Sequence, residues 1–191
     1  MQQNREILEF FAHYIEKQIG IVYLEANYFQ LEHRLNEIVF QLGFTDLKQL
    51  HEFALEGVQG QLKDLLLDLA TNNETSFFRE QSAFTALAES IIPNIFTHNP
   101  SLRYLRIWSA AGSTGQEAYS IAMCLEGVKK TQPQLLGYEI LMTDFSERVL
   151  TQAQGGLYSQ LELQRGVPEK YLNEFFDPEK EGSWRIKSEL R

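Results

Sequence analysis

The segment of residues 106–120 constrains the fold more than any other part of the sequence. It reads Arg-Ile-Trp-Ser-Ala-Ala-Gly-Ser-Thr-Gly-Gln-Glu-Ala-Tyr-Ser, so an apolar strand passes through a turn of small residues directly into a helix. Gly112 and Gly115 lack side chains where a ligand must approach the backbone closely, and the following helix directs its unpaired amides at the same space. This order of strand, glycine turn and helix predicts a cradle for a nucleotide cofactor.

A second short strand strengthens this prediction. Residues 139–144 read Glu-Ile-Leu-Met-Thr-Asp, an apolar run that ends in Asp144 one helix further along the chain. A carboxylate at the end of the second strand of such a unit can accept a hydrogen bond from a ribose hydroxyl on each oxygen. Asp144 as a simple turn acid, or as the N-cap of a helix over 147–153, is an equal alternative on this pattern alone.

The composition excludes several other classes of protein. Every apolar run falls short of the roughly 20 residues that span a bilayer. The N-terminus has no secretory pattern, so we expect a cytoplasmic protein without membrane insertion. Cys124 is the single cysteine and the four histidines have no ligand-like spacing, so we expect a buried Cys124, no disulfide and no metal site. The net charge of -9 argues against nucleic acid as the main partner.

The N-terminal third of the chain is predicted to be helical. Apolar residues recur every three or four positions in four stretches, which are residues 7–15, 28–42, 47–54 and 62–69. Gly20 and Gly43 are expected to end the first two helices, and Thr45 is expected to cap the third. Short helices joined closely bury their apolar stripes against one another, so residues 1–72 are assigned to a compact helical subdomain.

The rest of the chain has a different pattern. A linking helix is predicted within 73–103 and is expected to stop near Pro93. From residue 104 the order strand, helix, strand, helix indicates a parallel sheet, with Trp108 buried in its first strand. A doubly wound domain has about five to seven strands, and only 184–187 offers a further candidate. Either the chain is part of a longer protein, or another chain, such as a second copy in a dimer, covers its exposed strand edge.

Four blocks occur along the chain in an order that is typical of one family. The first reads Asn-Glu-Thr-Ser-Phe-Phe-Arg-Glu at 73–80, and the second begins Trp-Ser-Ala-Ala-Gly-Ser-Thr-Gly at 108. The third is Thr-Asp at 143–144, and the fourth combines Gly-Leu-Tyr at 156–158 with Arg-Gly-Val-Pro at 165–168. Together these blocks resemble the CheR-type chemotaxis receptor methyltransferases.

The resemblance implies an α/β fold in three parts. These are an all-helical N-terminal subdomain over 1–72, a linking helix region over 73–103, and the N-terminal part of a Rossmann-like S-adenosylmethionine-dependent methyltransferase domain over 104–191. It also implies methyl transfer to glutamate side-chain carboxylates of a chemotaxis receptor, with S-adenosylhomocysteine as the product. The partner would be the cytoplasmic helices of a chemoreceptor or another protein substrate.

The resemblance also implies the site residues. Those expected to hold the cofactor, with Asp144 on the ribose, are Asn73, Thr75, Arg79, Gly112, Gly115, Glu117 and Asp144. Arg79 is in addition the expected catalytic residue, because a planar guanidinium can bind the cofactor's carboxylate or orient the substrate's carboxylate. Without the resemblance, Arg79 beside Glu80 favours a solvated surface pair, and Glu117 is equally a first-turn acid that complements the helix dipole.

Two departures from the family leave alternatives open. In the family the second helix is rich in Lys and Arg and meets acidic receptor helices, whereas residues 26–43 carry only Arg34, against Glu32 and Glu37. A methyltransferase of a different protein substrate is therefore an alternative. The family's later strands, with their asparagines beside the adenosine and a tyrosine near the methyl group, have no counterpart here. A regulatory or adaptor module that binds the cofactor without catalysis is the other alternative.

Overall fold

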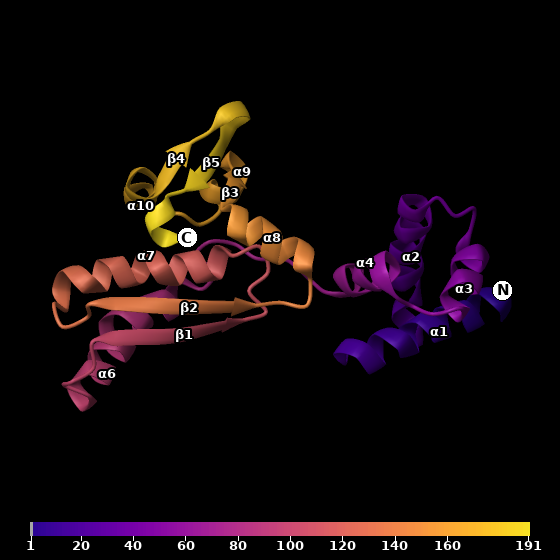
Figure 1. Ribbon diagram of the computed structural model, residues 1–191, viewed down its shortest axis with the longest axis horizontal. Coiled ribbons are helices and arrows are strands. Elements are labelled where there is room, and N and C mark those ends of the chain that lie inside the picture. Colours follow the sequence, from indigo (N-terminus) through magenta and orange to yellow (C-terminus); the bar gives the residue numbers. More distant parts are fainter. Residues whose placement is uncertain (1) are drawn as a thin grey trace. The chain divides into compact units, whose positions relative to one another are not determined.

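The computed structural model describes residues 2–191, with side chains from residue 4 onward (Figure 1). The chain divides into two compact units, Met1–Asn72 and Asn73–Arg191. The linking region over 73–103 therefore belongs to the same unit as the α/β part. Among the described residues, no helix combines the length and the apolar character that a membrane span requires.

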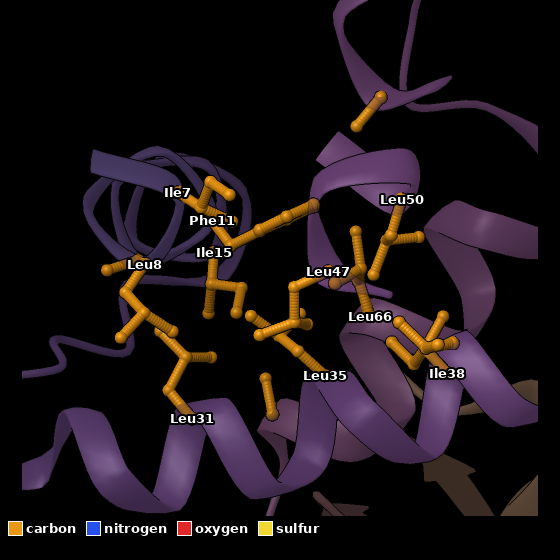
Figure 2. Close-up of a cluster of buried hydrophobic side chains, with 14 of the residues drawn as sticks. Ile7, Leu8, Phe11, Ile15, Leu31, Leu35, Ile38, Leu47, Leu50 and Leu66 are labelled. Atoms are coloured by element: carbon orange, nitrogen blue, oxygen red, sulfur yellow. The ribbon is translucent and has the colours of Figure 1, made fainter. Parts of the chain in front are cut away.

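The first unit is a bundle of short helices. Its elements within residues 2–72 are α1 (Gln2–Ile19), the 3-10 turn η1 (Glu25–Asn27), α2 (Tyr28–Leu42), α3 (Leu47–Leu55) and α4 (Gly60–Ala70). Gly43 ends α2 in the left-handed conformation, with φ 74°, as its position after the apolar stripe predicts. The stripes of the four α-helices meet in one core, shown in Figure 2, which includes Phe11, Ile15, Leu31, Leu35, Ile38, Leu50 and Leu66.

Two helix boundaries differ from the sequence prediction. The N-cap of α3 is Asp46, whose Oδ1 accepts a hydrogen bond from the amide of Gln49 at 2.9 Å, so the assignment of Thr45 was wrong by one residue. The expected stop near Pro93 was also wrong. The chain passes from α5 (Gln81–Ala86) through the π-helical segment η2 (Leu87–Ile91) into α6 (Ile92–His98), and Pro93 lies in the first turn of α6. Proline is tolerated there because that turn needs no amide donor.

The centre of the second unit is a parallel pair of strands. β1 (Tyr104–Ala110) and β2 (Gly137–Thr143) are joined by α7 (Gln116–Thr131), and α8 (Glu147–Gly155) follows β2. The register runs from Tyr104 opposite Gly137 to Ala110 opposite Thr143, so both strands end at the same edge. Alternate side chains of the strands enter a core with α6 and α7 that contains Leu105, Leu125, Val128, Ile92 and Phe96. The α/β class predicted from the sequence is confirmed.

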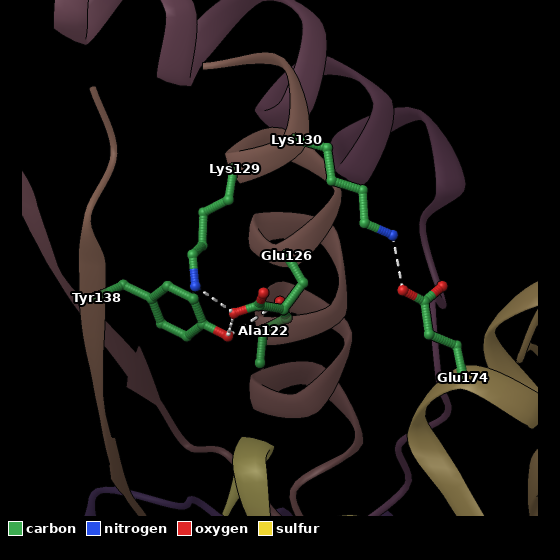
Figure 3. A network of polar contacts seen from close by, with 6 residues as sticks. All are labelled: Ala122, Glu126, Lys129, Lys130, Tyr138 and Glu174. Atoms are coloured by element: carbon green, nitrogen blue, oxygen red, sulfur yellow. Dashed lines mark hydrogen bonds and ion pairs between the residues drawn. The ribbon is translucent and has the colours of Figure 1, made fainter. Parts of the chain in front are cut away.

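A polar network fastens α7 to its neighbours (Figure 3). The Tyr138 hydroxyl lies 2.9 Å from Glu126 Oε1, and Lys129 Nζ lies 3.1 Å from the same oxygen. Burial, and then the Glu126 carboxylate, raise the pKa of Tyr138, so the phenol keeps its proton and donates it. Lys130 Nζ reaches Glu174 Oε1 on α10 (Glu169–Phe175) at 2.7 Å. The helix that begins at the glycine turn is thereby held on two sides.

The opposite face of the parallel strands is open in the described part of the chain. Trp108 is 69% exposed and Leu141 60% exposed, and Tyr104 lies on the same face. The expected burial of Trp108 was therefore wrong. Its indole Nε1 donates instead to Thr143 Oγ1 on the neighbouring strand at 3.0 Å. Parallel sheets are normally covered on both faces, whereas this face exposes these three apolar side chains beside the ion pair of Arg106 and Glu139.

The C-terminal part forms a separate antiparallel sheet. Its elements are β3 (Leu157–Ser159), α9 (Gln160–Gln164), α10, β4 (Phe176–Pro178), the 3-10 turn η3 (Lys180–Gly182), β5 (Ser183–Ile186) and the 3-10 turn η4 (Ser188–Leu190). The strand order is β3-β5-β4. The candidate strand at 184–187 thus exists, but it pairs here and does not extend the parallel sheet. This small sheet shares a core with α7 that contains Phe77, Met123, Tyr158, Phe176 and Ile186.

Candidate functional site

The turn between β1 and α7 has an unusual backbone. Ala111, Ser113 and Gly115 have φ values of 57°, 52° and 90°, so two residues with side chains adopt the left-handed conformation. Hydrogen bonds from outside the turn fix it: the Gly112 amide donates to the Thr143 carbonyl at 3.0 Å, and the Tyr158 hydroxyl donates to the Thr114 carbonyl at 2.7 Å. Strained backbone that is held in this way is characteristic of functional sites.

Both glycines of the turn are required by the protein's own side chains. A Cβ at Gly112 would lie 2.1 Å from Cγ of Met142, and a Cβ at Gly115 would lie 2.8 Å from Cβ of Ala153. The sequence prediction explained these glycines by the approach of a ligand. The structure gives a further reason, which is the close packing of the turn on β2 and α8.

Asp144 fastens the turn to the end of β2. Its Oδ2 accepts the Ser113 amide at 2.9 Å, and its Oδ1 accepts the Ser146 amide at 3.0 Å. The N-cap of α8 is Ser146, whose hydroxyl accepts from the Val149 amide, so Asp144 is not that cap. The carboxylate is half-buried and fixed at both oxygens. Each oxygen keeps a second lone pair that can accept a hydroxyl proton.

Glu117 lies in the first turn of α7 and is held by a residue that the sequence reasoning missed. The hydroxyl of Ser109, which is 2% exposed on β1, donates to Glu117 Oε1 at 2.8 Å. The exposed carboxylate therefore has a fixed orientation at the end of the strands. Only the place of Ser109 at the carboxyl end of a strand, beside the turn, could have signalled this contact.

The segment of residues 73–79, which we call the strap, lies against the turn and α7. The Ser113 hydroxyl donates to the Asn73 carbonyl at 2.8 Å, and the Phe78 amide donates to the Ser120 hydroxyl at 3.0 Å. Asn73, Thr75 and Arg79 are thus carried by one segment that is fastened at both ends. Ser113 joins the strap to Asp144, since its amide and its hydroxyl each bind one of them.

Arg79 is exposed, and its guanidinium Nη1 donates to the Glu74 carbonyl within the strap at 3.1 Å. The contact is with a backbone oxygen, in contrast to the surface pair with Glu80 that the sequence alone favours. Thr75 is half-buried in the middle of the strap.

The strap is also packed from the side of the antiparallel sheet. The ring of Phe77 is fully buried, with Tyr158 at 4.9 Å and Phe176 at 5.6 Å between ring centroids. A Cβ at Gly166 would lie 1.8 Å from the Phe77 carbonyl oxygen, so the loop over 165–168 touches the strap backbone directly. The fourth sequence block therefore has a structural role that the sequence did not reveal.

The described residues offer neither a metal site nor an exposed thiol. Within them, no group of three or more His, Cys, Asp or Glu side chains is arranged to hold a metal ion. Cys124 is buried as expected, and burial raises the pKa of its thiol. The groups of the site that could bind a ligand are therefore carboxylates, backbone amides and the guanidinium of Arg79.

Parallel strands joined by a helix, a strained small-residue turn and an acid at the end of the second strand define a nucleotide-cofactor-binding α/β domain. The family model described as "CheR methyltransferase, SAM binding domain" matches residues 73–191. The chain belongs to this family, and its cofactor is S-adenosylmethionine. The resemblance that the sequence blocks indicated is thereby confirmed.

Curated relatives agree with this assignment. The "Chemotaxis protein methyltransferase Cher2" of Pseudomonas putida is 36% identical over 185 residues, which cover 96% of this chain and 67% of the relative. "Chemotaxis protein methyltransferase 1" of Pseudomonas aeruginosa is 35% identical with the same coverage. The "Chemotaxis protein methyltransferase" of Vibrio parahaemolyticus is 32% identical over 182 residues, which cover 95% of this chain and 65% of the relative. The chain spans about two thirds of the length of these relatives.

The residues present fit this cofactor. S-adenosylmethionine carries ribose hydroxyls and an amino-acid carboxylate, and a carboxylate fixed like that of Asp144 and a guanidinium like that of Arg79 are chemically complementary to these groups. The turn at 111–115 keeps one fixed backbone path and carries no side chain at Gly112 or Gly115, as a backbone cradle requires.

Gly166→Ala tests the contact between the loop and the strap. We expect the unfolding free energy to fall by about 2 kcal/mol or more, because the new methyl group overlaps a backbone carbonyl that cannot move freely. Thermal unfolding followed by circular dichroism measures the change. Gly127→Ala in the middle of α7 is the matched control, since its Cβ would meet nothing closer than 3.8 Å, and it should be neutral or stabilising by up to about 1 kcal/mol. Equal stability of the two variants would contradict the packing described.

Proposed function

We propose that the protein transfers the methyl group of S-adenosylmethionine to glutamate side chains of a chemotaxis receptor. The observation that carries this proposal is the convergence of the strap, the turn and Asp144 on Ser113, in a chain of the CheR family. Receptor glutamates lie on cytoplasmic helices, so the proposal assigns the protein to the cytoplasm. It also assigns residues 1–72 to the helical subdomain and 104–191 to the methyltransferase domain, linked by 73–103.

Each site residue has a proposed role. Asp144 accepts hydrogen bonds from the ribose hydroxyls, and Glu117 holds the cofactor from the first turn of α7. Gly112 and Gly115 form the backbone cradle. The strap residues Asn73, Thr75 and Arg79 act at the methionine end. These separate roles for Asp144 and the strap are supported by their contacts with Ser113: Asp144 binds its amide, and the strap binds its hydroxyl.

The proposed methyl transfer requires no proton transfer by the protein. S-adenosylmethionine supplies an activated methyl group when it is bound. A glutamate carboxylate with a pKa of about 4.3 is already ionised at neutral pH, so no general base is needed. The task of the strap is therefore alignment and the exclusion of water. We propose that Arg79 does this through its permanent charge and planar geometry, by holding the cofactor's carboxylate.

A different protein substrate is the second candidate, and one contact favours it. Arg34 is the only Lys or Arg over 26–43, and its Nη1 donates to the Leu69 carbonyl within the helical unit. Of the acidic residues of α2, Glu32 is half-buried, and Glu37 is exposed and pairs with His33. Docking on strongly acidic helices is thus poorly supported by charge, and a less acidic substrate surface fits better.

We propose that the open face of β1 and β2 is covered in the working protein, by a second copy of the chain or by further polypeptide. Exposed Trp108 and Leu141 support this, because parallel sheets are rarely left bare. Light scattering of the 191-residue chain over a range of concentrations would decide. Twice the chain mass of 22.1 kDa favours the second copy, and the single mass favours further polypeptide.

Asp144→Ala should weaken binding of S-adenosylhomocysteine by roughly 10-fold to 100-fold, because it removes a charged acceptor of hydrogen bonds and loosens the Ser113 amide. Isothermal titration calorimetry measures this directly. Asp177→Ala, which removes an exposed carboxylate on β4, is the matched control and should bind like the wild type. Wild-type affinity in Asp144→Ala would exclude the ribose role.

Arg79→Ala should abolish methyl transfer, because alignment of the reacting groups is lost. Transfer of a tritiated methyl group to a receptor fragment, and to other candidate proteins, is the measurement. Arg103→Ala is the control, since that exposed guanidinium donates to the neighbouring backbone carbonyls of Pro100 and Leu102. Normal turnover of Arg79→Ala would reject its catalytic role. A wild-type protein that binds S-adenosylhomocysteine but methylates none of the acceptors would favour the adaptor alternative.

A further inference from the structure

Phe78, the residue before Arg79, has a strained backbone. Its φ is 48°, a left-handed conformation that bulky side chains rarely adopt. The strain lies within the strap, one residue from the guanidinium assigned to the cofactor. Such a conformation persists only where the surroundings hold it.

The group that holds the Phe78 backbone is the hydroxyl of Ser120. This residue is completely buried in the second turn of α7. Its Oγ accepts the Phe78 amide at 3.0 Å and lies 2.6 Å from the Gln116 carbonyl, to which it donates its proton. A hydroxyl is suited to this place because it donates and accepts at once. Alanine would leave the Phe78 amide without this acceptor.

The ring of Phe78 is held as well. It stacks on Tyr171 with an interplanar angle of 25° and meets Phe84 edge-on at 5.0 Å. With the ring and the amide both fixed, the direction in which the chain leaves Phe78 is fixed too. Arg79 is the next residue, and its Nη1 donates a hydrogen bond to the Glu74 carbonyl at 3.1 Å.

We propose that Ser120 is a positioning residue for cofactor binding: through the amide of Phe78 it orients Arg79 toward the carboxylate end of the cofactor. The proposal rests on the proposed function, which assigns Arg79 to that carboxylate. Ser120 itself touches the strap backbone and not the cofactor.

Two ligands separate this role from a merely structural one. S-adenosylhomocysteine carries the amino-acid carboxylate, whereas 5'-methylthioadenosine has the adenosine part without it. Ser120→Ala should weaken binding of S-adenosylhomocysteine by about tenfold and leave 5'-methylthioadenosine unchanged, as one charged hydrogen bond is misdirected. Arg79→Ala should show the same selectivity, and the double variant should be no weaker than Arg79→Ala alone. Ser120→Thr, which keeps the hydroxyl, should restore wild-type selectivity.

Thr131→Ala is the matched control, because Thr131 is on the same helix and its hydroxyl also donates to a backbone carbonyl, that of Val128, at 3.1 Å. It should leave both affinities unchanged. Unchanged binding in Ser120→Ala, equal weakening of the two ligands, or additive losses in the double variant would each overturn the proposal.

A second measurement does not depend on the cofactor. Hydrogen–deuterium exchange at the Phe78 amide should accelerate in Ser120→Ala and not in Thr131→Ala, because the amide loses its acceptor. If the wild type bound neither ligand, the proposed function would fail, and this exchange rate would still test the Ser120 contact. Unchanged exchange at Phe78 would overturn the inference whatever the ligands do.

Discussion

The geometry of the site depends on the hydrogen bonds of Ser113. Its amide binds the carboxylate of Asp144 at the end of β2, and its hydroxyl binds the Asn73 carbonyl at the start of the strap. Because β1 and β2 run parallel, their carboxyl ends meet at one edge, and this alone brings Asp144 near the turn. Three segments far apart in sequence are therefore joined through one small polar residue. An apolar residue at 113 would keep the amide contact to Asp144 and lose the hydroxyl contact to the Asn73 carbonyl.

Strain and restraint occur together around this edge. Ala111, Ser113 and Phe78 all have left-handed backbones, and each of the last two has its amide bonded to a side chain from elsewhere in the fold. Left-handed conformations of residues with a Cβ are unfavourable, so these contacts do more than add stability: they select one backbone path. Because the backbone is already ordered, it loses less conformational entropy when a ligand binds.

The sequence predicted those features that depend on neighbouring residues. Apolar periodicity and Gly43 placed the helices of the first unit, and the glycine turn with Asp144 identified the edge of the sheet. Prediction from the sequence failed for features that depend on contacts between residues far apart in the chain. The exposure of Trp108 depends on whether anything covers its face, which no local pattern records. The roles of Ser109 and Ser120 also depend on partners, since a buried serine in a strand or helix is indistinguishable from a small filler until its hydroxyl's contacts are known.

The two units place different demands on a protein substrate. The edge of the sheet that carries Asp144 requires fixed charges and a rigid backbone, whereas the family resemblance assigns substrate docking to the outer surface of the helical unit. That unit has 5 Lys or Arg against 11 Asp or Glu over residues 1–70, and Arg34 is engaged with the Leu69 carbonyl. Attraction of an acidic helix by this surface is therefore weak. Exposed apolar side chains such as Phe40 and Phe29 on α2 remain, so affinity for a partner would come from apolar burial and would depend little on ionic strength.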